Sequence, residues 1–217
     1  MTEIHSPVDD LSSDAGITVG PVSKADLAQV VDVLARGMRG NPLHIAAFGD
    51  DPDAREHRLR QMFSLTSKRP GFLDTVTVAR QADGTIVGVY SAMPPGKCLP
   101  NPAERILMMP LMLPLGIGNA RRVVSWLGTW AKHDPDTRHW HFGPFAVDAH
   151  LQGQGIGSTL MREFCRQMDA AAETAYLETD KEANIRFYQK FGFEVIEEGP
   201  ALGTPQWYML RKPNQQK

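Results

Sequence analysis

The chain has 217 residues, 42% of them hydrophobic, with a formal net charge of −2 and a sequence pI of about 6.4. This length and composition allow one sizeable packed domain, and the near-neutral charge provides no strong basic field for nucleic acid or anionic lipid. Only two cysteines occur, Cys98 and Cys165, which suits a reducing compartment and predicts no disulfide.

No targeting or membrane-spanning segment is predicted. Residues 1–15 are polar and acidic and lack the basic and apolar regions of a secretory signal, so we expect a flexible tail. The most apolar stretch, residues 106–118, is too short to span a bilayer and is interrupted by Pro110 and Pro114. We therefore expect a cytoplasmic protein without a membrane partner.

The first seventy residues predict one strand and two helices. Residues 17–22 are expected to form a short strand, and residues 23–38 a helix capped by Ser23, because apolar residues recur there at helical spacing. An Asn-Pro pair ends this helix, since the residue before a proline avoids helical conformation. Residues 51–68 predict a second helix, whose acidic first turn suits the helix dipole.

Residues 75–92 carry the plainest local signal, that of a β-hairpin. Two alternating runs rich in β-branched residues flank Asp83-Gly84, a favoured tight-turn pair. Residues 94–137 follow, with many prolines and glycines and short amphipathic pieces. We expect them to form a partly helical insertion between strands.

The remaining residues predict two strand–helix units and a closing strand pair. The expected ranges are a strand at 139–148, a helix from the following glycine loop to about 173, a strand at 175–179, a helix at 181–191 that Gly192 caps, and strands at 193–198 and 206–211. Together the elements predict one α/β domain over residues 16–213. Its mixed, mostly antiparallel sheet would have helices on both faces, unlike a doubly wound dinucleotide fold.

The glycine loop lies in the stretch "LQGQGIGSTL", residues 151–160. Glycines let a ligand approach the main chain, and the first amides of a helix have no internal partner, so a strand–glycine–helix junction suits a pyrophosphate. No Lys follows Gly157, which excludes a P-loop, and the glycine spacing differs from the G-x-G-x-x-G of dinucleotide-binding folds. A glycine turn selected only for tight packing is the structural alternative.

A third phosphate-loop pattern, [QR]-x-x-G-x-[GA], fits at Gln152, Gly155 and Gly157. With "FAVD" before the loop, "YLET" after the helix and then "NIRFYQKFGFEV", the chain resembles the GCN5-related N-acetyltransferase (GNAT) superfamily over residues 139–198. Within that superfamily it is most similar to small-molecule acetyltransferases of the puromycin N-acetyltransferase type.

The resemblance implies a GNAT fold with a splayed parallel strand pair and acetyl-coenzyme A as cosubstrate. The backbone of the strand ending at Val147 would bind the pantetheine arm and thioester as an added strand would, which requires it to splay away from residues 175–179. The loop amides would hold the pyrophosphate. The implied cofactor-binding residues are Phe145, Ala146, Val147, Gln152, Gly153, Gln154, Gly155, Ile156, Gly157, Ser158, Asn184 and Tyr188.

For catalysis, the resemblance implies that Tyr188, one helical turn after Asn184, protonates the departing thiolate. A phenol of ordinary pKa, about 10, is protonated at neutral pH, although a buried packing role is the alternative. Relatives often carry a basic Glu where this chain has Gly143. Two substitutes for the general base are His141, on the strand face of Gly143, and Glu178, on the neighbouring strand; a surface histidine and an ion-paired glutamate are the structural alternatives.

The sequence does not point to an acetyl-accepting nucleophile. Cys165 lies mid-helix with no histidine beside it in the sequence, so we expect a buried packing residue and direct transfer in a ternary complex.

The acceptor would enter between the early helices and the splayed strands. Residues there that could contact it, or could serve packing and the helix dipole instead, are His44, Asp50, Asp51, Asp53, Met108, Met109, Leu111, Met112, Leu113 and Trp126.

We therefore expect an acyltransferase that transfers acetyl from acetyl-coenzyme A to a primary amine of a small molecule. No metal and no nucleic acid are expected, and a homodimer is one option. Two alternatives remain: a non-catalytic acyl-coenzyme A binding or sensing module on the same fold, and a protein or peptide N-acetyltransferase.

Overall fold

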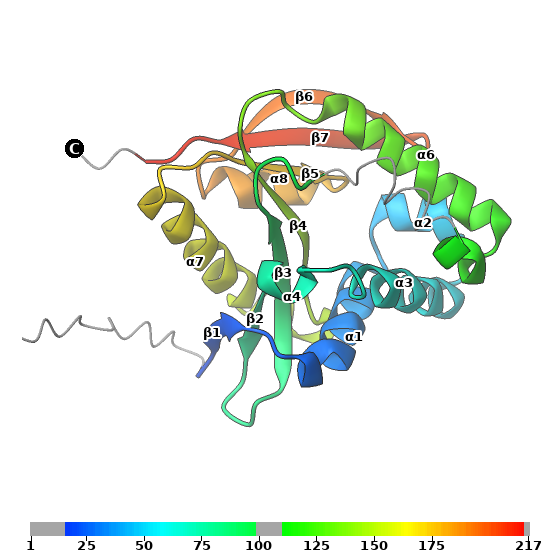
Figure 1. The fold of residues 1–217 in the computed structure, drawn as a ribbon, viewed down its shortest axis with the longest axis horizontal. Coiled ribbons are helices and arrows are strands. Elements are labelled where there is room, and N and C mark those ends of the chain that lie inside the picture. The colour runs from blue at the N-terminus through cyan, green and yellow to red at the C-terminus, as the bar shows by residue number, and fades with distance from the viewer. Residues whose placement is uncertain (1–15, 99–109, 215–217) are drawn as a thin grey trace, which may run out of the picture.

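The computed structural model describes residues 16–98 and 110–214 (Figure 1). The expected tail at 1–15 and residues 99–109 of the expected insertion lie outside the described residues, and so do Met108, Met109 and the side chain of Leu111.

The described residues contain one seven-stranded sheet in the order β1-β2-β3-β4-β5-β7-β6. The strands are β1 (Thr18–Pro21), β2 (Val76–Arg80), β3 (Ile86–Met93), β4 (Trp140–Val147), β5 (Ala175–Thr179), β6 (Glu194–Ala201) and β7 (Thr204–Arg211). Only β4 and β5 pair in parallel, and all other neighbours are antiparallel. The expected mixed, mostly antiparallel sheet with a parallel pair is confirmed.

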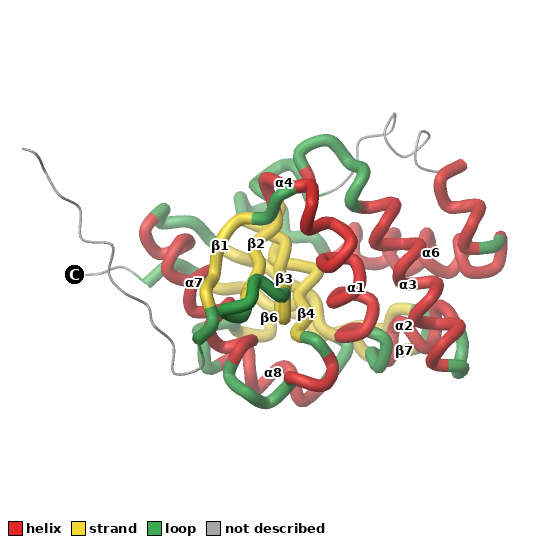
Figure 2. Tube along the Cα trace, turned by 90° about the horizontal axis from the view of Figure 1, so that it is seen from below, coloured by secondary structure: helices red, strands yellow, loops and turns green. Residues whose placement is uncertain are grey.

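Helices cover both faces of this sheet, with α7 on one side and α1, α3 and α6 on the other (Figure 2). The α-helices are α1 (Leu27–Met38), α2 (Pro42–Phe48), α3 (Pro52–Thr66), α4 (Phe72–Thr75), α6 (Ile117–His133), α7 (Ile156–Ala170) and α8 (Glu182–Gln189). Short 3-10 helices are η1 (Lys24–Asp26), η2 (Pro110–Leu115) and η3 (Ala149–Leu151). Within the part of the chain that the structure describes, no helix is long and apolar enough to cross a membrane.

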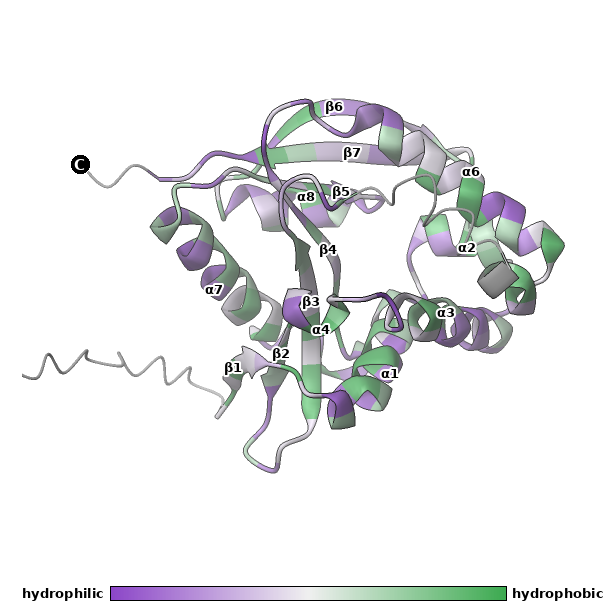
Figure 3. Cartoon of the chain, in the orientation of Figure 1, coloured by the Kyte–Doolittle hydropathy of each residue, from purple (hydrophilic) through white to green (hydrophobic). Residues whose placement is uncertain are grey.

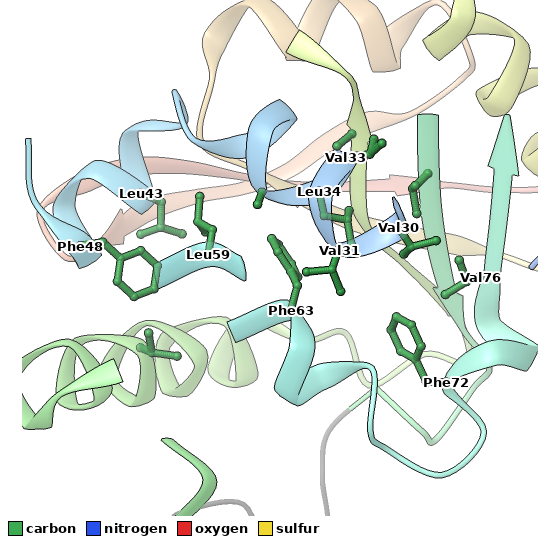
Figure 4. Packing of buried hydrophobic residues seen from close by; sticks show 14 of the residues in the cluster. Val30, Val31, Val33, Leu34, Leu43, Phe48, Leu59, Phe63, Phe72 and Val76 are labelled. Carbon is green, nitrogen blue, oxygen red and sulfur yellow. The ribbon is translucent and has the colours of Figure 1, made fainter. Parts of the chain in front are cut away.

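Two apolar clusters fill the space between sheet and helices. One packs α1 and α3 against the sheet, and Figure 4 shows Val31 and Leu34 of α1 beside Phe63 of α3. The other packs the buried face of α7, including Leu160 and Phe164, against the opposite face. Apolar and polar residues alternate around α1 and α7 in Figure 3, as expected of helices with one buried side.

Local signals explain most element boundaries. Asp51 caps α3 by accepting hydrogen bonds from the amides of Asp53 and Ala54, at 3.0 and 3.1 Å. The expected hairpin is present as β2 and β3, and Gly84 in its turn has φ +86°. The sequence did not predict α2 or α4, and most of the described insertion is the 17-residue helix α6.

Candidate active site

The glycine loop forms the predicted strand–turn–helix junction. Gly153 and Gly155 have φ of +81° and +87°, which glycine adopts far more readily than other residues. Helix α7 begins at Ile156, and its first internal hydrogen bond runs from the Thr159 amide to the Gly155 carbonyl at 3.0 Å. The amides of residues 156–158 precede this bond, so they are available at the positive end of the helix dipole for an anionic ligand.

Neighbouring residues hold this turn against the sheet. The Gln152 side-chain amide donates to the Val147 carbonyl at 3.1 Å and to the Gly37 carbonyl at 3.4 Å, which ties the turn to the ends of β4 and α1. A Cβ on Gly157 would lie 3.4 Å from Phe145 Cζ, so the first turn of α7 packs closely on β4. Gln152 therefore positions the turn in this structure.

Strands β4 and β5 separate after two paired positions. Trp140 pairs with Ala175 and His141 with Tyr176, whereas the rest of β4 pairs only with β3 and the rest of β5 only with β7. The backbone of residues 145–147 thus has an edge facing the gap that no strand of the described chain occupies. An extended ligand could pair with this edge, and the expected splay is present.

A β-bulge in β4 reshapes the strand within the splay. Between Tyr90 and Ala92, β3 advances two residues while β4 advances three, from Phe145 to Phe142. The extra residue breaks the period-two alternation, so the expected common face of His141 and Phe145 is interrupted: the Phe145 ring lies beside Phe142 at 5.3 Å. Gly143 in the bulge has φ +149°, a conformation open to glycine and strained for a glutamate.

Tyr188 and Asn184 lie on α8 beside the splay. The Tyr188 ring centroid is 6.5 Å from that of Phe145, and only 6% of the residue is exposed. Burial, with a smaller contribution from Asp180, raises the pKa of Tyr188 above its ordinary value. Asn184 donates from Nδ2 to Thr179 Oγ1 at 3.2 Å, at the end of β5. The cofactor and proton-donor roles of these residues stay predictions.

The two base candidates contact each other. His141 Nε2 lies 2.9 Å from Glu178 Oε2, and the exposed fractions of their side chains are 17% and 3%. Burial alone would lower the pKa of His141, but the Glu178 carboxylate and further partners raise it well above its ordinary value. His141 is therefore not a surface histidine, and in its protonated form it is the cationic partner that the structural alternative for Glu178 requires. Their part in catalysis stays a prediction.

Sequence reasoning missed three residues that meet His141 on its other side. Cys98 follows β3, Asp134 follows α6, and His139 precedes β4. Their ligand atoms and one from His141 all lie within 4.8 Å of one another. The His-x-His spacing at the start of β4, which puts both side chains on one strand face, was the available signal.

On the acceptor side, the structural alternatives account for Asp51, His44, Trp126 and Met112 among the described candidate residues. Asp51 caps α3, as described above. His44 is 3% exposed and packs edge-on against Trp126 with ring centroids 5.3 Å apart, so both belong to the core. Met112 packs against the core, whereas Leu113 is exposed. Asp180, which the sequence did not single out, accepts a 2.7 Å hydrogen bond from the Leu43 amide and joins α2 to the end of β5.

Cys165 is a packing residue in this structure. It is buried on α7, and its Sγ faces the Phe191 carbonyl at 3.9 Å. Burial raises the pKa of its thiol to about 11, which disfavours the nucleophilic thiolate. This agrees with the expectation of a buried thiol, and both cysteines are unpaired.

Comparisons with known proteins agree with this geometry. Residues 118–195 match the family model of the acetyltransferase (GNAT) domain. A solved Corynebacterium glutamicum protein described as "histone acetyltransferase HPA2 and related acetyltransferase" superposes with TM-score 0.68 at 24% identity, covering 93% of this chain and 99% of that one.

Two further solved structures share the fold at lower identity. The Drosophila melanogaster polyamine N-acetyltransferase matches with TM-score 0.61 and 16% identity, covering 90% of this chain and 99% of that one. An agmatine N-acetyltransferase matches with TM-score 0.60 and 17% identity, covering 91% and 99%.

Proposed function

We propose, on the premise that this chain carries an acetyltransferase (GNAT) domain and is an acyltransferase, that it transfers acetyl from acetyl-coenzyme A to a primary amine of a small molecule. The observation that carries the proposal is the opening between β4 and β5, which begins after His141 and ends at the first turn of α7. One end offers helix amides to an anion, and the other has paired ionisable side chains.

The residues around the opening fit acetyl-coenzyme A as cosubstrate. The amides of residues 156–158 suit its pyrophosphate, and the unpaired edge at residues 145–147 suits its amide-containing arm. Glycine at 153 and 155 keeps side chains away from the approach to these amides. Asn184, whose amide nitrogen already bonds Thr179 Oγ1, retains its carbonyl oxygen for the same arm.

In direct transfer, the amine nitrogen forms a bond to the acetyl carbonyl carbon while the carbon–sulfur bond breaks. Tyr188 gives its phenol proton to the departing sulfur, and its raised pKa keeps that proton available at neutral pH. The proton that the amine loses passes to the His141–Glu178 pair, with Glu178 accepting it and His141 holding the carboxylate in place. The buried thiol of Cys165 takes no part.

The similarity to solved agmatine and polyamine N-acetyltransferases supports a small amine as acceptor. The test is the release of coenzyme A thiol from acetyl-coenzyme A over a panel of primary amines that includes polyamines, agmatine-like amines and a lysine peptide. We expect thiol release that depends on a small amine and yields its N-acetyl product. Release with the peptide alone would instead identify a peptide acetyltransferase.

One observation favours a second function, a non-catalytic acyl-coenzyme A binding module. Gly143 stands where relatives often carry the basic residue, and its φ of +149° fits glycine. If acetyl-coenzyme A binds tightly and no amine in the panel causes thiol release, the protein is a non-catalytic acyl-coenzyme A binding module.

A further inference from the structure

Three side chains that the proposed acetyl transfer does not use converge on His141 beside the start of β4. Cys98, Asp134, His139 and His141 come from the segment after β3, the end of α6, and β4 with the residue before it. One ligand atom from each lies within 4.8 Å of the other three. Such a mixture of thiol, carboxylate and imidazoles is the donor set of a transition-metal site.

A contact to the nitrogen that faces away from the cluster orients each histidine ring, so that the other ring nitrogen turns its lone pair toward the cluster. The Nδ1 of His139 lies 2.7 Å from the Thr137 carbonyl, which can only accept, so this nitrogen carries the hydrogen. The Nε2 of His141 likewise donates to the Glu178 carboxylate at 2.9 Å. In the neutral rings, His139 Nε2 and His141 Nδ1 then point lone pairs at the cluster, the arrangement that metal-binding histidines adopt.

Two of the atoms that face the cluster lack a hydrogen-bond partner. Asp134 Oδ1 and His141 Nδ1 are buried without a hydrogen bond within the described residues, and an unsatisfied buried polar atom is costly. Asp134 Oδ1 lies 3.3 Å from His139 Nε2 and 3.8 Å from His141 Nδ1, and neither contact is a hydrogen bond. A cation between them would satisfy all of these atoms together.

We propose that Cys98, Asp134, His139 and His141 bind one Zn²⁺ ion. In a tetrahedral zinc site with bonds of about 2.0–2.3 Å, neighbouring ligand atoms are about 3.3–3.8 Å apart. The distance from Cys98 Sγ to His139 Nε2 is 3.8 Å, and the two distances to Asp134 Oδ1 are 3.3 and 3.8 Å. The widest separation, up to 4.8 Å, closes with side-chain shifts of about 1 Å.

The charges also balance. A thiolate and a carboxylate with two neutral imidazoles carry −2, which a divalent cation neutralises. Four protein ligands leave no open position, so the site is structural rather than catalytic. It joins the segment after β3 and the end of α6 to β4, and it fixes the ring of His141 that contacts Glu178. A hollow of about 310 Å³, lined in part by Gly96, Cys98 and Asp136, lies against the cluster and gives a metal a path of entry.

Protonation of the same side chains competes with metal binding at this cluster. Burial lowers the pKa of His139, but Asp134 and Cys98 raise it by more, to about 10, so an imidazolium can face the carboxylate instead. The same neighbours act on Cys98, where desolvation raises the thiol pKa and the histidines lower it to a net value of about 7. A metal ion displaces these protons and binds the thiolate form of Cys98. A metal titration therefore distinguishes a metal-binding cluster from one that only holds protons.

The test is a Co²⁺ titration of the chelator-treated full chain, followed by displacement with Zn²⁺. We expect one Co²⁺ per chain, the intense visible bands of tetrahedral cobalt, and a near-ultraviolet thiolate-to-cobalt band. Cys98→Ser should abolish the near-ultraviolet band and weaken Zn²⁺ binding by at least about tenfold, and Asp134→Asn should also weaken it. Circular dichroism before metal addition verifies that each variant is folded.

Two variants are matched controls. Cys165→Ala removes the other thiol and His150→Ala removes an exposed imidazole, and both should bind Co²⁺ and Zn²⁺ as the unaltered chain does. Absence of stoichiometric Co²⁺ binding, or a Cys98→Ser variant with an unchanged spectrum and affinity, would overturn the proposal in favour of a proton-filled cluster. The titration uses neither acetyl-coenzyme A nor an amine, so its failure leaves the proposed acetyl transfer standing.

Discussion

Substitution of Gly37 by alanine tests the close approach of α1 to β4 beneath the cofactor turn. A Cβ at Gly37 would lie 2.5 Å from the Val147 carbonyl oxygen and 2.9 Å from Ala146 Cβ. Neither atom can rotate away, because one is main chain and the other is fixed to it. Carbon atoms pack best at about 3.5–4.0 Å, so α1 must move from β4 by about 1 Å.

The expected cost follows from two opposing effects. Overpacking costs about 1–3 kcal/mol, whereas replacing a helical glycine by alanine gains about 1 kcal/mol. Gly128 of α6 has no neighbour within 4 Å of a built Cβ, so Gly128→Ala gains the second effect alone and is the matched control. The free energy of unfolding of Gly37→Ala should therefore be about 1–3 kcal/mol below that of Gly128→Ala.

Urea denaturation of both variants measures this difference, provided that their m-values agree. Because the Gln152 amide bonds the carbonyls of Val147 and Gly37, displacement of α1 should also raise the KM for acetyl-coenzyme A in Gly37→Ala only. Equal unfolding free energies and equal KM values in the two variants would refute the close approach as a determinant of the site.

Three further outcomes are expected. Tyr188→Phe should lower kcat by about 10²–10⁴-fold. Because burial raises the Tyr188 pKa, kcat of the unaltered enzyme should not fall near pH 10, and a decrease of kcat there would count against Tyr188 as the proton donor. Glu178→Gln keeps an acceptor for His141 but removes the base. In a variant that circular dichroism shows to be folded, kcat should fall by about 10²-fold or more, and an unaltered kcat would exclude the role. Desolvation raises the Asp148 pKa, but the hydrogen bonds and positive charge of Arg36 lower it by more. Asp148→Asn should therefore lower the free energy of unfolding in urea by about 1–3 kcal/mol above pH 4. That difference should shrink as the pH falls through the depressed pKa, and a constant difference down to pH 2 would contradict the linkage.

Much of the fold could be predicted because local physics determines it. Alternating β-branched residues around Asp83-Gly84 specify the hairpin, and glycines at 153 and 155 supply the positive φ values that the turn before α7 requires. The strand and helix order from β4 to β7 follows from hydrophobic periodicity. Helices α2 and α4 were missed because they have only seven and four residues, and tertiary contacts such as the Leu43–Asp180 hydrogen bond hold α2.

The candidate site was predicted unevenly for a related reason. The glycine turn is contiguous in sequence, so spacing alone identifies it. The His141–Glu178 contact joins residues 37 positions apart across a parallel strand pair, and pairing register cannot be derived from either segment separately. The bulge in β4 shifts which residues share a face, and Cys98 reaches His139 from a segment that no local pattern places there.

The most direct test of the proposed cofactor site is a crystal structure of the protein with acetyl-coenzyme A. We expect the pyrophosphate against the amides of residues 156–158, the pantetheine arm between β4 and β5, and the thioester sulfur within hydrogen-bonding reach of the Tyr188 hydroxyl. Density for the nucleotide at another surface, or a thioester remote from Tyr188 with the gap between β4 and β5 empty, would contradict it.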